Sequence, residues 1–117
     1  MLQVTKRPVG SGATSYNVEL ENQANEGFGM AVAVLRVPSC AEAAHNLLEK
    51  LVESGEVDYY EVLNHGSDVV FYWRSLQPHE KKKVNATLVK RFEGSECRER
   101  PHKAYLYYDE EGTEVWT

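Results

Sequence analysis

The chain has 117 residues, enough for one domain with its own hydrophobic core and no need of a metal or disulfide to fold. Its composition, 42% hydrophobic and 26% charged, is ordinary for a globular protein. The net charge of −5 argues against a nucleic-acid partner, and the lysine run at 81–83 is interpreted as a solvated strand end. No apolar stretch approaches the roughly 20 residues of a membrane span, and residues 1–12 carry no secretory signal.

The beginning of the chain is predicted to be irregular and then to become β. Pro8, Gly10, Ser11 and Gly12 indicate a lead-in or linker over residues 1–13, so a single domain is expected over 14–117. The alternating stretch "SYNVEL" predicts a first strand. The nearly continuous apolar run "MAVAVLRVP" then predicts a strand in the middle of a sheet.

One convincing helix is predicted, over "SCAEAAHNLLEKLVESG" at 39–55. Ser39 and Glu42 have capping-box spacing, and Gly55 stands where a left-handed residue would end the helix. One face carries an apolar stripe that should pack on the sheet: Ala44, Leu47, Leu48, Leu51 and Val52. The opposite face should be exposed: Glu42, His45, Asn46, Glu49, Lys50 and Glu53.

The rest of the chain again predicts strands. "VDYYEVL" and "VVFYWRSL" form a hairpin signal around "NHGSD", and "KVNATLVKRF" alternates with Val84, Ala86 and Leu88 inward. In "KAYLYY", Ala104, Leu106 and Tyr108 should share one face and Tyr105 and Tyr107 the other, "DEEG" predicts an acidic turn, and "EVWT" closes the chain. About seven short strands with one inserted helix predict a mainly β fold, a two-sheet antiparallel β-sandwich.

Catalytic and cofactor motifs are missing from the sequence. The histidines at 45, 65, 79 and 102 lack metal-ligand spacing, and no P-loop, dinucleotide fingerprint or nucleophile elbow is present. Cys40 would lie at the start of the predicted helix, where a thiolate is favoured, but no orienting partner for a base can be identified. We therefore expect a protein that is not an enzyme and holds no metal or cofactor.

Three residues are candidates for covalent chemistry of a structural kind. Cys40 and Cys97 are the only cysteines, and the sequence leaves open whether they are buried free thiols or a disulfide. Asn85 begins an Asn-Ala-Thr sequon and should point outward from its strand, as N-glycosylation requires.

Three segments in order carry a family resemblance. "GMAVAVLRVPSC" (29–40) is similar to a family strand that begins with Gly-Met and leads into a helix. "SDVVFYWRSLQP" (67–78) is similar to a Val-rich strand and its turn, and "KAYLYYDEE" (103–111) to a tyrosine-rich signature near the C-terminus. With these segments the chain, over roughly 14–117, resembles the C-terminal receptor-binding domain of α2-macroglobulin-like proteins, the eighth macroglobulin domain of the complement and thioester-protein group. These segments are more similar to those of divergent or prokaryotic-type members than to those of vertebrate plasma proteins.

The resemblance implies a non-catalytic C-terminal domain of a larger secreted protein, extracellular or periplasmic, that inhibits proteases or serves defence. Such a domain packs against the other domains of its parent and offers a surface to a protein receptor after activation. In vertebrate members two lysines a helical turn apart meet an acidic receptor. Here Lys50 alone can be carried over, and it stands among Glu42, Glu49 and Glu53, an arrangement that an acidic receptor would repel. The alternative is an independent Ig-like adhesion or carbohydrate-binding module that uses outward Tyr59, Tyr72 or Trp116.

Overall fold

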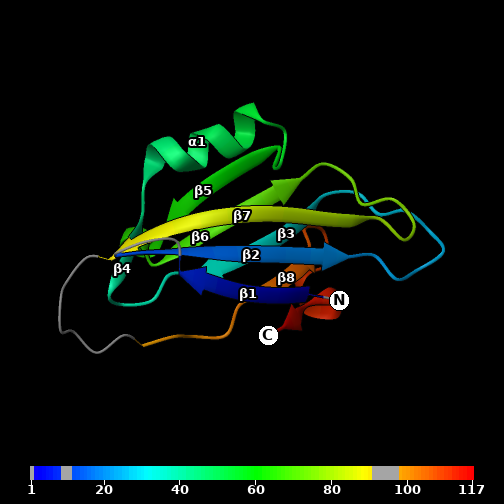
Figure 1. Cartoon of the computed structure of the whole chain (residues 1–117). Coiled ribbons are helices and arrows are strands. Elements are labelled where there is room, and N and C mark those ends of the chain that lie inside the picture. The colour runs from blue at the N-terminus through cyan, green and yellow to red at the C-terminus, as the bar shows by residue number, and fades with distance from the viewer. Residues whose placement is uncertain (1, 9–11, 91–97) are drawn as a thin grey trace.

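The structure, a computed structural model, describes residues 2–8, 12–90 and 98–117. Within these residues two antiparallel sheets face each other, so the predicted β-sandwich is confirmed (Figure 1). The first sheet has the order β1-β2-β7-β4, with bounds β1 Leu2–Pro8, β2 Ala13–Glu21, β7 Lys81–Lys90 and β4 Ala41–Ala43. The second has the order β5-β6-β3-β8-β9, with bounds β5 Tyr59–Leu63, β6 Asp68–Trp73, β3 Ala31–Arg36, β8 Lys103–Leu106 and β9 Val115–Trp116.

The main core lies between the sheets and follows the strand alternation. Val84, Ala86 and Leu88 on β7 are buried as predicted, opposite Phe71 and Trp73 of β6 in the same cluster. The indole Nε1 of Trp73 donates to the carbonyl oxygen of Glu56 at 2.7 Å, so its one polar group is satisfied. The alternating pattern therefore placed the inward side chains of β7 correctly.

The N-terminal residues form a strand, not the irregular lead-in that was expected. Residues of β1 pair with β2 over their whole length, from Leu2 opposite Leu20 to Pro8 opposite Thr14. Pro8 cannot donate a ladder hydrogen bond, but β1 is an edge strand, and Pro8 is its last residue. The prediction of an irregular lead-in is therefore wrong for residues 2–8, which pair as a strand.

The helix α1 is shorter than predicted and spans His45–Glu53. Residues 41–43 instead pair with Leu88–Lys90 as β4, and Ala44 is the N-cap without a side-chain hydrogen bond. The predicted Ser39–Glu42 capping box is therefore wrong, because the backbone there is satisfied by the sheet. At the other end Gly55 has φ of +83°, and its N–H donates to Val52 O while Glu56 N–H donates to Leu51 O. These two bonds form a Schellman motif, as the glycine predicted.

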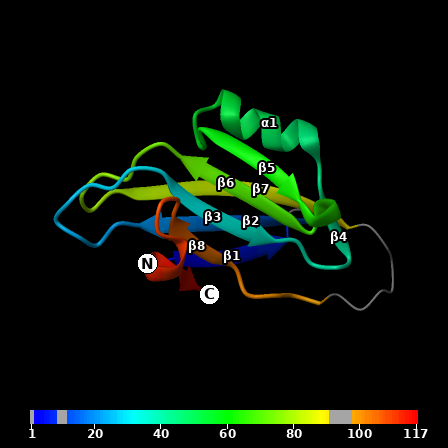
Figure 2. The same ribbon diagram turned by 180° about the vertical axis from the view of Figure 1, so that it is seen from behind.

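The helix lies along β5 and beside β7, at one open side of the sandwich (Figures 1 and 2). Leu48 and Leu51 are buried, whereas Val52 remains 37% exposed, so the apolar stripe is only partly covered. The predicted polar positions are exposed. A 3₁₀ turn, Asn64–Gly66, connects β5 to β6 and confirms the predicted hairpin.

The C-terminal segment differs from expectation in two ways. Tyr108 lies beyond the end of β8 and is 64% exposed, so it is not on the strand face that was expected to carry it with Ala104 and Leu106. The acidic stretch forms a short helix, α2 Glu110–Thr113, because the Asp109 carboxylate accepts from the N–H of Gly112 and caps it. In the described part of the chain, each helix is too short and too polar to serve as a membrane span.

Candidate protein-binding surface

The outward side chains of the second sheet form two lines across its strands. Tyr59, Tyr72, Val32 and Tyr105 are successive register partners on β5, β6, β3 and β8. The next line along the strands consists of Glu61, Val70, Val34, Lys103 and Trp116. Because side chains alternate between faces along a strand, both lines point away from the main core. We call the apolar members of this region, together with Tyr107, the outer aromatic face: Val32, Val34, Tyr59, Val70, Tyr72, Tyr105, Tyr107 and Trp116.

This face is a small second core as well as a surface. Val32, Val34 and Val70 are buried, and Tyr72 and Tyr105 pack against them. The rings of Tyr59 and Tyr72 have centroids 5.6 Å apart and a tilted arrangement. Aromatic pairs at such separations are attractive. The tyrosines therefore shield the central valines from solvent, as a second layer would.

Hydrogen bonding and burial hold Tyr72 in its neutral form. Its hydroxyl donates to Glu61 Oε1 at 2.5 Å. Burial, and then the bond to this carboxylate, raise the pKa of Tyr72 well above its usual range. Burial likewise raises the pKa of Tyr105, with a further contribution from the charge of Glu110. Neither hydroxyl is thereby activated as a base or nucleophile, since both are made harder to deprotonate.

Lys103 contacts two aromatic rings at the β8-β9 side of the outer aromatic face. Its Nζ lies 5.3 Å from the ring centroid of Tyr105 and 5.4 Å from that of Trp116. The same ammonium is 2.8 Å from Glu110 Oε2, and the Lys103 side chain is only 16% exposed. A cation between two rings and a carboxylate fixes their relative positions. The arrangement keeps the Trp116 ring against the sheet although it is 51% exposed.

The outer face of the first sheet has the opposite chemistry. A shallow concavity there has a lining whose described residues are all polar or charged: Thr5, Arg7, Ser15, Asn17, Glu19, Lys83 and Asn85. Lys81 and Lys83 each lie 3.8 Å from Glu19, a pairing that surface screening makes weak. Asn85 is exposed on this face, as the alternation predicted. Its modification stays a prediction.

A groove separates α1 from the edge strand β5. It has a volume of about 740 Å³, and its lining comprises His45, Glu49, Val52, Glu53, Tyr59, Tyr60, Glu61 and Val62. The rings of His45 and Tyr60 are 6.4 Å apart. Burial, and then the charge of Glu49, which also lines the groove, raise the pKa of Tyr60. Lys50 is exposed on α1 but does not line the groove.

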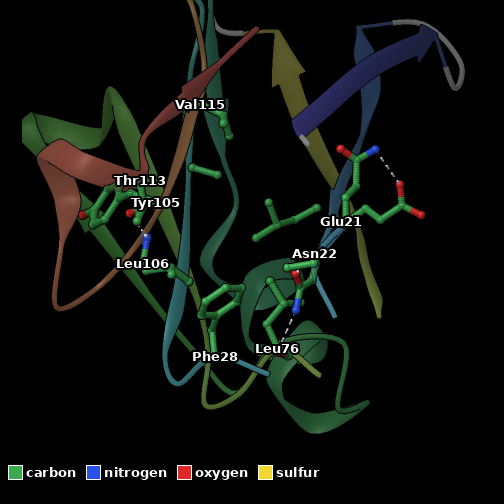
Figure 3. A pocket seen from close by; sticks show the side chains of 12 residues that line it. Glu21, Asn22, Phe28, Leu76, Tyr105, Leu106, Thr113 and Val115 are labelled. Carbon is green, nitrogen blue, oxygen red and sulfur yellow. Dashed lines mark hydrogen bonds between the residues drawn. The ribbon is translucent and has the colours of Figure 1, made fainter. Parts of the chain in front are cut away.

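A smaller apolar cavity of about 260 Å³ opens at the end of the sandwich (Figure 3). Its walls include Leu20, Phe28, Leu76 and Val115, from both sheets and the connections between them. The Asn22 amide, buried beside it, donates to Leu76 O at 3.3 Å and to Gln77 O at 2.9 Å. These bonds tie two loops together, so Asn22 has a structural role here.

The cysteines do not support a nucleophile. Cys40 lies five residues before the first residue of α1, not at a helix start, and it is disulfide-bonded. Cys97 lies outside the described residues, so its pairing with Cys40 stays a prediction.

The fold and this arrangement of surfaces agree with one comparison. The family model for the A-macroglobulin receptor binding domain matches residues 26–116. The match covers most of the chain, and the chain therefore belongs to this family. A comparison with curated proteins finds no match. The family is one of non-catalytic domains, and the matched region includes both the outer aromatic face and the groove.

The sequence had indicated part of this site. Tyr59, Tyr72 and Trp116 were predicted to face outward, and the structure places all three on the outer aromatic face. Lys103 and Glu61 were not predicted as members of the site. Their roles depend on cross-strand partners, which the sequence of a single strand does not reveal. Lys50 is exposed as expected, and its contact with a receptor stays a prediction.

Proposed function

We propose that this domain acts without catalysis as a protein-binding module of a larger α-macroglobulin-like protein. In that setting it packs against neighbouring domains, and it offers a surface to a protein partner once the parent protease inhibitor or defence protein is activated. The observation that supports the proposal is the outer aromatic face, which exposes rings where a solvated sheet would carry polar side chains.

The free energy available from covering this face is substantial. Tyr59 is 58% exposed, Tyr107 62% and Trp116 51%. Burial of apolar area stabilises by about 25 cal/mol per Å², and aromatic side chains are the largest contributors at protein interfaces. The Trp116 ring is also held in place before binding by its contact with Lys103, so little conformational entropy of this side chain is lost on docking. These features support the outer aromatic face as a binding surface for a protein partner.

Hydroxyl-radical footprinting of the parent protein tests the proposal. Oxidation of Tyr59, Tyr107 and Trp116 is measured in this chain alone, in the intact parent, and in the parent after protease cleavage. We expect low oxidation in the intact parent and higher oxidation after cleavage. Equal oxidation in all three samples would show that no domain covers the face. The parent reading frame gives an independent check, because the family setting requires a Cys-Gly-Glu-Gln thioester motif in an upstream helical domain.

The proposed setting is an oxidising one, extracellular or periplasmic. Cys40 is disulfide-bonded, and stable disulfides are typical of such compartments. We propose that Cys97 is its partner, which mass spectrometry of non-reduced peptides can test. A bridge that closes so long a loop contributes about 4 kcal/mol to the free energy of unfolding in the loop-entropy model. Reduction should therefore lower the denaturation midpoint, and a linear Cys97 peptide in the non-reduced digest would contradict the pairing.

A second function, carbohydrate binding by an adhesion-type module, has one observation in its favour. The Tyr59 and Tyr72 rings lie side by side on the sheet, 5.6 Å apart, and flat aromatic surfaces can stack against sugar rings. A glycan array with this chain and its Tyr59→Ala and Trp116→Ala variants tests the idea. Binding that is unchanged in both variants, or absent altogether, would count against it.

A further inference from the structure

The groove between α1 and β5 combines exposed apolar surface with a concave shape. Val52 is 37% exposed and Tyr59 58% exposed, and both line the groove with the partly buried Tyr60 and Val62. Large apolar side chains that remain exposed in a hollow of this size are typical of binding sites. The groove also shares Tyr59 and Glu61 with the surface of the second sheet, so it continues the outer aromatic face around the edge of the sandwich.

The charge of the groove selects among occupants. Glu49, Glu53 and Glu61 line it, and within the described lining His45 is the only basic side chain. Glu49 and Glu53 stand four residues apart on α1, where like charges destabilise a helix. No lysine or arginine of the described ranges forms an ion pair with either carboxylate. This repulsion is present in the free domain, and a cationic occupant would relieve it.

We infer that the groove binds a lysine- or arginine-bearing segment of a protein partner. The inference rests on the proposed function and adds the chemistry of the partner. A guanidinium or ammonium group in the groove meets the Glu49 and Glu53 carboxylates on one wall and the Tyr59 and Tyr60 rings on the other. Charge-assisted hydrogen bonds and cation–π contacts are the strongest polar interactions available to such groups.

The polarity is opposite to that of a receptor contact through Lys50. An acidic partner would have to approach Lys50 past Glu49 and Glu53, which lie on the same short helix. A basic partner is instead attracted by these residues and by the net charge of the chain, −5. Electrostatic attraction of this kind mainly raises the association rate and excludes partners of the wrong sign.

Two short peptides serve as probes, because the natural segment is unidentified. Hexa-arginine and hexa-glutamate, each acetylated and amidated, are titrated into the ¹⁵N-labelled chain, and amide shifts and dissociation constants are measured by NMR. We expect hexa-arginine to shift the amides of 45–53 and 59–62, and hexa-glutamate to shift none of them. Binding of hexa-glutamate that Lys50→Gln abolishes would overturn the inference and favour an acidic receptor.

A matched pair of variants separates the groove from general electrostatics. The first carries Glu49→Gln, Glu53→Gln and Glu61→Gln, where the glutamine at 61 can still accept from Tyr72. The second removes three exposed carboxylates elsewhere, by Glu26→Gln, Glu111→Gln and Glu114→Gln. We expect the groove variant to weaken hexa-arginine binding at least about tenfold and the control less than about twofold. Equal weakening in the two variants would mean that the attraction is diffuse, and it would overturn the inference that the groove binds a basic segment.

The outcome is independent of the footprinting experiment. Peptide binding is measured on this chain alone, whereas footprinting is measured on the parent. If specific peptide binding is absent while footprinting protection is present, the groove inference is rejected and the proposed function is retained. Protection that is absent while the groove still binds hexa-arginine would reject packing against neighbouring domains. Thermal unfolding of each variant confirms that the fold is retained.

Discussion

On the outer face of the first sheet, Thr5, Asn17 and Asn85 face one another across three strands as polar side chains. On the second sheet the corresponding line runs from Tyr59 through Tyr72 and buried Val32 to Tyr105. Both sheets bury their other face in the same core, so the main core does not account for the contrast. The difference is that, among the described residues, only the second sheet carries a second layer on its outer face, in which Tyr72 and Tyr105 pack against buried valines.

The largest expected effect comes from placing a charge at matched positions on the two outer faces. Val32→Asp should lower the free energy of unfolding by about 3 kcal/mol or more, because the carboxylate is buried beneath rings without a partner. Thr5→Asp, a substitution of similar shape on the exposed face, should change it by less than about 0.5 kcal/mol. Urea denaturation measures both. Similar values for the two would mean that the outer aromatic face is not a second core.

A smaller effect is expected from removing one lysine from each face. Lys103→Met keeps the aliphatic stem and removes the ammonium that contacts Tyr105, Trp116 and Glu110. It should cost about 1 kcal/mol, since cation–π contacts of a shielded ammonium are worth about that much. Lys83→Met, which removes a weak surface pair with Glu19, should be nearly neutral. A rise in Trp116 fluorescence quenching by iodide in the Lys103 variant alone would confirm that Lys103 holds this ring.

The two faces also differ in how far the sequence predicted them. Alternation assigned Val84, Ala86 and Leu88 to the core because a period of two is a local property of one strand. The alternative hypothesis of an adhesion or carbohydrate-binding module also used Tyr59, Tyr72 and Trp116 as outward side chains. Alternation could not show that these side chains meet, because their alignment depends on the register of β5-β6-β3-β8-β9. Two of the four pairings in this sheet, β6 with β3 and β3 with β8, join strands that are not consecutive in the chain.

The incorrect predictions have a common physical cause. Residues 41–43 have good helix formers and a capping pattern, yet they form β4 because β7 offers unpaired backbone groups at 88–90. Leu2–Pro8 lacked a strong strand signal and was ordered by pairing with β2. In both cases a long-range hydrogen-bond partner overrode local propensity. Gly55, whose role depends on its own φ, was predicted correctly.

Alkaline titration compares a tyrosine of the outer aromatic face with one of the main core. Burial, and then Glu99, raise the pKa of Tyr16 to about 12, and burial with the bond to Glu61 raises that of Tyr72. Both values exceed the ordinary 10.0 of an unfolded tyrosine. The folded state therefore holds these protons longer, and its stability is complete below about pH 10 and falls as the pH rises further.

Tyrosine-to-phenylalanine variants test which hydroxyl is responsible for this loss of stability at high pH. Tyr72→Phe should cost about 1 kcal/mol at pH 7, through the lost hydrogen bond to Glu61. It should also flatten the fall in unfolding free energy above about pH 10, because one titrating group is gone. Tyr16→Phe should flatten the same interval for the main core. If the unfolding free energy of both variants falls with pH in parallel with that of the unsubstituted chain, neither hydroxyl is responsible for the loss.

The smallest expected effect belongs to the polar face. Asn85 is exposed on β7, and its backbone N–H donates to Glu56 Oε2 at 3.3 Å, a bond that does not use the side chain. Asn85→Gln should therefore change the unfolding free energy by less than about 0.5 kcal/mol. After expression through a eukaryotic secretory route, the unsubstituted chain should carry a glycan that peptide N-glycosidase removes, and the variant should not. A glycan on this face would leave the outer aromatic face uncovered. The glycosylated chain should therefore still bind hexa-arginine in the groove. A loss of that binding would contradict the separation of the two faces.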